Sequence, residues 1–351
     1  MNLGFGNFVS QFGHNPILCV ITVLICGVVL VNGWTDAPNA IATCVATRSL
    51  SPKKALVMAA VLNFLGVLVM TFLSTTVAET IYKIVDFGGN TQNALIALCA
   101  ALVAIVVWSL FAWIFGIPTS QSHALIASLS GAAISIQHGI SGINFEQWKK
   151  VLYGLAISTV FGFILGFLIN RLIEKICNNV DRRKTVPFFK KTQVIGDAVM
   201  TFMHGAQDGQ KFLAIFIMGA FLANGVARAE NFSIPIWMMI GCSAIMTLGT
   251  CIGGSKIIKN VGMNMAKIEP YQGTSADLAG SVCLIFSSFT GIPVSTSQTK
   301  TTAIMGVGAS KGRSNVDWNI AKNMVIAWIV TFPGCGLLGY LLTTVLIKIF
   351  G

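Results

Sequence analysis

Charged side chains are scarce in this chain. Only 10% of its 351 residues are Asp, Glu, Lys or Arg, whereas 54% are hydrophobic. A soluble globular domain carries about 25% charged residues, so this composition excludes that class. Acidic residues are the scarcest: 12 stand against 23 basic ones, which gives a net charge of +11. In a chain this hydrophobic, a basic excess indicates loops on the cytoplasmic side of a membrane rather than nucleic-acid binding.

Metal-ligand and cleavage patterns are also missing. The nine cysteines contain no CxxC pair, and most stand in apolar runs, where cysteine behaves as a small hydrophobic residue. The four histidines show no metal-ligand spacing. Residues 1–15 contain no Lys or Arg, so they lack the basic start of a cleaved signal peptide. We therefore expect the first apolar run to be retained.

What is present is a series of apolar segments of about 20 residues, the length needed to cross a bilayer as a helix. The sequence predicts an all-α polytopic membrane protein. Residues 171–194 interrupt the series with seven basic residues against two acidic ones. We interpret them as a basic cytoplasmic linker between a first transmembrane repeat, residues 1–170, and a second one, residues 195–351.

The first apolar run, Pro16 to Val31, leads into a stretch that should break a helix at membrane depth. Pro38 lacks an N–H and disfavours helix at the residue before it. A break in hydrocarbon frees backbone carbonyls, which are tolerated only where they line a cavity or bind something. Asp36 places a carboxylate beside those carbonyls, and Asn39 follows on the same face. These are ligand types that suit a hard cation.

A comparable stretch, His204 to Lys211, stands between Ile195 and Leu222. We expect a second break there, with Asp208 and Lys211 as the counterpart pair. A carboxylate inside a spanning segment is costly unless it is paired, faces a cavity or binds a cation. A lysine at this place could supply a fixed positive charge in place of one bound cation.

Two hydroxyl-rich stretches each follow a Gly-Ile-Pro sequence. The prolines, Pro118 and Pro293, suit the first turn of a helix. Helix N-termini with free N–H groups and nearby hydroxyls bind anions without a full opposing charge. Ordinary N-capping and close helix packing explain a single such stretch better, but the matched pair favours oxyanion binding. The candidate substrate-binding residues are Thr119, Ser120, Gln121, Ser122, Ser295, Thr296, Ser297 and Gln298.

The two halves carry these features in the same order. Asp36 precedes Pro118 by 82 positions, and Asp208 precedes Pro293 by 85. An odd number of crossings in each half, about five if every segment spans, gives the halves opposite orientations. The Ser-rich segments could instead be re-entrant hairpins that meet near the midplane, which would change the count. Either way, we expect inverted-topology repeats with both termini outside.

These stretches resemble the PiT family of inorganic phosphate transporters, the Pho4 superfamily. The family's Gly-Ala-Asn-Asp-Val-Ala-Asn-Ala type signature is matched at Gly33–Ala40 and Gly205–Lys211, and its Pro-Val-Ser-Thr-Thr-His type stretch at Pro118–His123 and Pro293–Gln298. The resemblance covers essentially the whole chain. It implies a secondary symporter in a cell inner membrane that takes up phosphate with Na⁺ or H⁺ by alternating access, with no organic cofactor and no catalytic residues. Asp36, Asn39 and Asp208 would then couple the cation.

Three residues depart from the family pattern. Thr35 and Lys211 stand where the family has Asn, and Gln298 stands where His is common. Lys211 leaves open whether sodium or protons drive transport. Sulfate as the substrate, an anion channel, and a homodimer also remain open. A membrane enzyme acting on a phosphate-bearing lipid would need a base near the anion, and His123 has no evident acidic partner.

Overall fold

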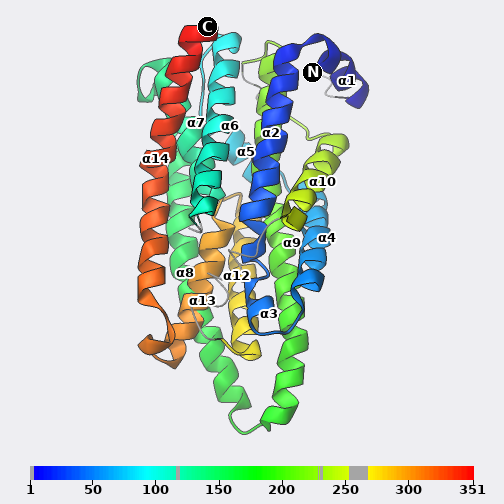
Figure 1. Ribbon diagram of the computed structural model, residues 1–351, viewed down its shortest axis with the longest axis vertical. Helices are drawn as coiled ribbons and strands as arrows, with labels where there is room; N and C mark the ends of the chain where they lie inside the picture. Colours follow the sequence, from blue (N-terminus) through cyan, green and yellow to red (C-terminus); the bar gives the residue numbers. More distant parts are fainter. Residues whose placement is uncertain (1–3, 116–118, 228, 230–231, 253–267) are drawn as a thin grey trace.

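The computed structural model describes residues 4–115, 119–227, 229, 232–252 and 268–351. Pro118 therefore lies outside the described residues, as do the basic residues between positions 253 and 267. The molecule is an elongated helical bundle whose two termini lie at one end, with the turn between α8 and α9 at the other (Figure 1). We call these the terminal end and the turn end. Five of the described helices are long and apolar enough to cross a membrane, which confirms the predicted class.

The first half contains an N-terminal helix, two spanning helices, a helical pair and a third spanning helix. Its main elements are α1 (Phe5–His14), α2 (Pro16–Thr35), α3 (Ala42–Ala46), α4 (Pro52–Leu73), α5 (Thr76–Tyr82), α6 (Thr91–Ile114), α7 (Gln121–Gln137) and α8 (Phe145–Cys177). The second half follows with α9 (Arg182–Ala223), α10 (Ile236–Ile252), α12 (Pro270–Thr290), α13 (Thr296–Lys311) and α14 (Trp318–Phe350).

The break predicted in the first half is confirmed. Helix α2 ends at Thr35, a single 3₁₀ turn covers Ala37–Asn39, and the short α3 follows. Pro38 stands in that 3₁₀ turn, where its missing N–H costs no α-helical hydrogen bond. The break places Asp36 and Asn39 side by side, and both side chains are buried.

The break predicted in the second half is wrong. Helix α9 runs without interruption from Arg182 to Ala223, straight through His204–Lys211. This stretch has no proline, and its glycines are packing positions rather than helix breakers. A Cβ on Gly205 would meet the backbone carbonyl of Asn63, and one on Gly209 would meet the side chain of Val67. Glycine therefore lets α9 approach α4 closely.

The Ser-rich segments are the return arms of two helical hairpins, an arrangement that favours re-entry over a full crossing. Helix α7 begins in mid-bundle and ends beside the C-terminal part of α14, where Ser135 Oγ lies 2.9 Å from Thr344 Oγ1. Its partner α6 also starts at that end, since Gln92 donates to the carbonyl of Phe350 at 3.4 Å. The α6–α7 hairpin thus enters from the terminal end (Figure 1).

The α12–α13 hairpin enters from the turn end. At the start of α12, Tyr271 donates to Glu174 near the end of α8 at 3.0 Å. At the end of α13, Ser310 accepts a hydrogen bond from Asn170 of α8 at 2.6 Å. The two hairpins therefore point toward each other from opposite ends of the bundle.

The predicted linker is mostly helical. Helix α8 continues to Cys177 and α9 begins at Arg182, so only residues 178–181 separate the two halves. Its basic side chains lie on two extended helix ends rather than on a free loop.

Candidate functional site

The tips of the two hairpins meet in the middle of the bundle. Ser120 caps α7 by accepting a hydrogen bond from the His123 N–H at 3.3 Å, and Ser295 caps α13 by accepting one from the Gln298 N–H at 3.2 Å. Between the tips, Ser122 Oγ donates to the carbonyl of Val294 at 3.4 Å. The two helix N-termini, with their free N–H groups, thus converge on one buried place.

Lys211 of α9 lies at that meeting point. Its buried ammonium donates to Ser122 Oγ and to the carbonyl of Val294, each at 2.6 Å, and to Asp208 at 2.7 Å. One positive charge therefore touches both hairpin tips and one carboxylate. The residue that departs from the family pattern is central to the site.

Two carboxylates and a histidine lie together beside the tips. The ligand atoms of Asp36, His204 and Asp208 all lie within 4.8 Å of one another, and all three residues are buried. Asn39 donates to Asp36 at 2.9 Å, and His204 Nε2 lies 3.4 Å from Asp208. Asp208 belongs to an uninterrupted helix and Asp36 to a broken one, yet the fold brings them to the same place.

Amide side chains that sequence reasoning missed hold these groups in position. Asn32 of α2 donates to Asp208 at 3.0 Å, and Asn63 of α4 lies 3.0 Å from His204 Nδ1. Both asparagines are fully buried inside otherwise apolar helices. That contrast is the signal by which the sequence could have identified them.

Most of the predicted substrate residues surround this place, but one does not. The buried set comprises Ser120, Gln121, Ser122, Ser295, Thr296, Ser297 and Gln298. The Gln121 side-chain amide donates a hydrogen bond to Ser109 Oγ of α6 at 2.7 Å. Thr119 instead lines a separate, mainly apolar hollow with Trp108 and Asn323. His123 is also occupied elsewhere, since it stacks on Phe332 with ring centroids 4.7 Å apart.

Several polar atoms at the tips have no hydrogen-bond partner among the described residues. They include Asn39 Oδ1, Gln121 Oε1, Thr296 Oγ1 and Gln298 Oε1. Buried polar groups are normally paired, so a cluster of unpaired ones indicates a place for ions or water. The site therefore combines cation-type oxygens with hydroxyl and N–H donors for an anion.

A second buried charge cluster lies nearer the turn end, and sequence reasoning missed it. Lys300 of α13 contacts Asp277 of α12 and Asp197 of α9, the latter at 3.0 Å. All three side chains are fully buried. Like Asp36, they are charged residues inside otherwise apolar or small-residue segments, so the same cost argument could have identified them.

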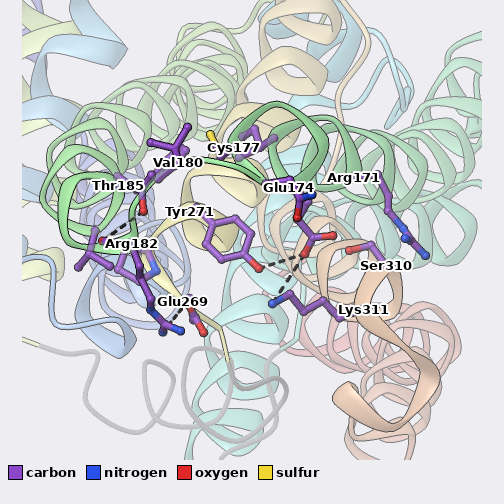
Figure 2. A pocket seen from close by; sticks show the side chains of 15 residues that line it. Arg171, Glu174, Cys177, Val180, Arg182, Thr185, Glu269, Tyr271, Ser310 and Lys311 are labelled. Atoms are coloured by element: carbon purple, nitrogen blue, oxygen red, sulfur yellow. Dashed lines mark hydrogen bonds and ion pairs between the residues drawn. The ribbon is translucent and has the colours of Figure 1, made fainter.

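Another hollow lies away from both clusters. It measures about 560 Å³ and lies among the ends of α8, α9, α12 and α13 at the turn end, as Figure 2 shows. Two ion pairs line it, Arg182 with Glu269 at 3.0 Å and Lys311 with Glu174 at 3.8 Å. Because this hollow lies away from the buried hairpin tips and from Lys211, we do not assign the substrate to it.

Comparison with known proteins agrees with this geometry. Residues 32–339 match the model of the phosphate transporter family. The chain belongs to the phosphate transporter family. It is 38% identical over 338 residues to a probable low-affinity inorganic phosphate transporter of Bacillus subtilis, covering 95% of this chain and 99% of that one. A protein of the same description from Rhizobium meliloti is 36% identical over 88% of this chain and 90% of its own length.

A solved structure described as a sodium-dependent phosphate transporter shares the fold. Its TM-score is 0.87 at 21% sequence identity, covering 95% of this chain and all of the other. Since these relatives are transporters, the prediction that the chain is not an enzyme is confirmed.

Proposed function

We propose that this phosphate transporter family member takes up inorganic phosphate across the cell's inner membrane as a cation-coupled symporter, with Na⁺ or H⁺ as the coupling ion. The observation that carries the proposal is the meeting of Lys211, Asp208 and Ser122 with the second hairpin tip in one buried place.

The charges of the site support cation coupling. Asp36 and Asp208 contribute two negative charges and Lys211 one positive charge, so the buried group carries one excess negative charge when His204 is neutral. A bound cation removes that excess and also lowers the cost of bringing an anion alongside. Asp36, Asn39 and Asp208 supply oxygen ligands for it.

The hairpin tips support oxyanion binding. Each tip offers a helix N-terminus and at least two hydroxyl groups, and Lys211 adds a positive charge between them. Hydroxyl and N–H donors bind phosphate without a full set of opposing charges, so release into the cell remains fast.

The arrangement of the halves supports alternating access by inverted repeats. Each half ends in a re-entrant hairpin and a 33-residue helix, α8 or α14. The first half runs from the terminal end to the turn end, and the second half runs back (Figure 1). Rocking of one half against the other would expose the tips to each side in turn.

Uptake by purified protein in proteoliposomes tests this proposal. We expect labelled phosphate to accumulate against its gradient when a sodium or proton gradient is imposed, with sulfate a poor competitor. Asp36→Asn and Asp208→Asn should abolish accumulation, because each removes the charge that attracts the cation. Lys83→Gln, outside the site near the surface, is the matched control and should transport as the wild type does.

Three results would contradict the proposal. Downhill flux without accumulation would make the protein a channel. Sulfate transported in preference to phosphate would change the substrate. Accumulation at the wild-type level in both aspartate variants would remove the assigned coupling site.

A further inference from the structure

The cluster of Asp197, Asp277 and Lys300 joins parts of the molecule that alternating access must move relative to one another. Asp277 and Lys300 belong to the two arms of the α12–α13 hairpin, and Asp197 belongs to α9. On the third side, Thr43 of α3 donates to Asp197 or Asp277, whose oxygens each lie 2.9 Å from its hydroxyl. The cluster thus closes the interface between the hairpin and α9.

The cluster carries an uncompensated charge, which is costly in a buried position. Two carboxylates and one ammonium group leave one excess negative charge, and all three side chains are fully buried. Lys300 donates to one oxygen of each carboxylate and to the carbonyl of Ala40 at 3.1 Å. The other oxygens, Asp197 Oδ2 and Asp277 Oδ2, have no hydrogen-bond partner among the described residues.

We propose that this cluster is a second ion-coupling site, in which Asp197 and Asp277 share one transported proton. The two carboxyl groups are held together by shared partners, because Lys300 and the Thr43 hydroxyl each contact one oxygen of both. Two carboxylates that share a buried place cannot both stay ionised at low cost, so the pair holds a proton. One proton neutralises the excess charge and supplies the donor that the unpartnered oxygens lack.

The geometry favours a proton over a metal ion. The position between the two carboxylates, which a metal ion would take, is already filled by the Lys300 ammonium. A hard cation needs six or so oxygen ligands, whereas a proton needs only the carboxyl oxygens. Among the described residues, the Cys44 thiol of α3 is a further titratable group beside the cluster.

The proposal rests on the proposed symport function and adds a coupling ion to it. Lys300 is three residues beyond Ser297 on α13. A movement of Lys300 therefore also moves the tip of the α12–α13 hairpin, where the substrate is proposed to bind. Asp197 and Asp208 share α9, about 16 Å apart along the helix axis. With the proton bound, the cluster has no net charge, so the hairpin can pack against α9. When the proton leaves, the excess charge favours their separation.

The test combines transport with a measurement that needs no transport. In proteoliposomes, we expect Asp197→Asn and Asp277→Asn to retain phosphate exchange but to lose accumulation driven by a proton gradient, because each variant is neutral without a proton. Asp277→Glu should keep both activities. In detergent, the wild-type melting temperature should fall relative to that of Asp277→Asn as pH rises from about 5 to 9, because only the wild type loses a stabilising proton.

The outcomes separate this inference from the proposed function. If Asp277→Asn accumulates phosphate on a proton gradient as the wild type does, the cluster is not a coupling site, although the symporter proposal stands. The inference is also overturned if the wild-type melting temperature depends on sodium concentration and has the same pH dependence as that of Asp277→Asn. If the wild type transports no phosphate, the symporter proposal fails, and the melting measurement still decides whether the cluster binds a proton.

Discussion

At the scale of single residues, two serines at matching places on the hairpin tips have different partners. Ser122 accepts a hydrogen bond from Lys211 and donates to Val294, whereas Ser297 lies beside Ser295 at 3.2 Å and within hydrogen-bonding reach of Asp36. Under the proposed function, Ser122 therefore serves the anion and its positive partner, and Ser297 lies between anion and cation.

Ser122→Ala and Ser297→Ala should each weaken the apparent affinity for phosphate. Each variant loses one hydrogen bond to a charged group, which contributes roughly 1.5–3 kcal/mol, a change of about 10- to 150-fold in KM. Ser297→Ala should also raise the cation concentration needed for half-maximal uptake, because Ser297 adjoins Asp36. Initial uptake rates against phosphate and against sodium or proton concentration measure both effects. Equal cation dependence in the two variants would contradict the division of roles.

The buried charges show how much of the site the sequence predicts. Asp36 and Asp208 were found because each follows a recognisable signature and breaks an apolar run. Asp197, Asp277 and Lys300 break apolar or small-residue segments just as plainly, but no turn or proline marks them. Their partnership also depends on how α9, α12 and α13 pack, since the two aspartates are 80 positions apart in the chain. No local pattern contains that information.

At the scale of helices, the return arm of each hairpin packs against a long spanning helix through a glycine. A Cβ on Gly131 of α7 would meet the backbone carbonyl of Gly336 on α14, and one on Gly306 of α13 would meet that of Phe163 on α8. The two halves thus use the same device, a small residue that brings two backbones into contact.

Gly131→Ala and Gly306→Ala should therefore destabilise the protein. The added methyl group must push two backbones apart, and overpacking of this kind costs typically 1–3 kcal/mol. Melting of the detergent-purified protein measures the loss. Gly241→Ala on α10 is the matched control, because nothing lies within 4 Å of a Cβ there. A drop in the control as large as in the two variants would show that backbone flexibility, not close packing, is the cause.

Helix continuity was the weakest part of the sequence-based prediction. In the first half, Pro38 ends a helix for a local chemical reason, and the prediction is confirmed. In the second half, only glycines stood at the expected break, and a glycine ends a helix or lets two helices touch according to its surroundings. Here the glycines let α9 touch α4 at Asn63 and Val67. These two residues are more than 130 positions away from the glycines in the chain.

At the scale of the whole molecule, the two buried clusters have the same charge composition. Each contains two aspartates and one lysine, and each spans an interface between a hairpin tip or hairpin arm and α9. Both clusters would be neutral with one cation or proton apiece. The proposed transporter thus has two places where an ion can compensate charge, one at the substrate and one on the turn-end side of it.

The distribution of basic residues predicts which end of the bundle faces the cytoplasm. Many of the described basic residues stand on elements that lie toward the turn end in Figure 1, namely the loop before α4, the end of α8, the start of α9 and the end of α13. They are Arg48, Lys53, Lys54, Arg171, Lys175, Arg182, Arg183, Lys184, Lys311 and Arg313. Basic residues close to spanning helices stay in the cytoplasm. Lys149 and Lys150 at the start of α8 and Lys348 in the last turn of α14 stand toward the terminal end, and they are fewer than the basic residues toward the turn end.

Protease accessibility should therefore differ between the two ends. A cleavage site inserted between Asn179 and Val180, in the turn that joins α8 to α9, should be cut in inside-out vesicles and protected in right-side-out ones. A cleavable tag after Gly351 should show the opposite pattern, because α14 ends at the terminal end. Both sites should be cut after detergent is added, which controls for access. Cleavage of both sites from the same face would contradict the odd number of crossings in the second half, and with it the inverted arrangement on which alternating access depends.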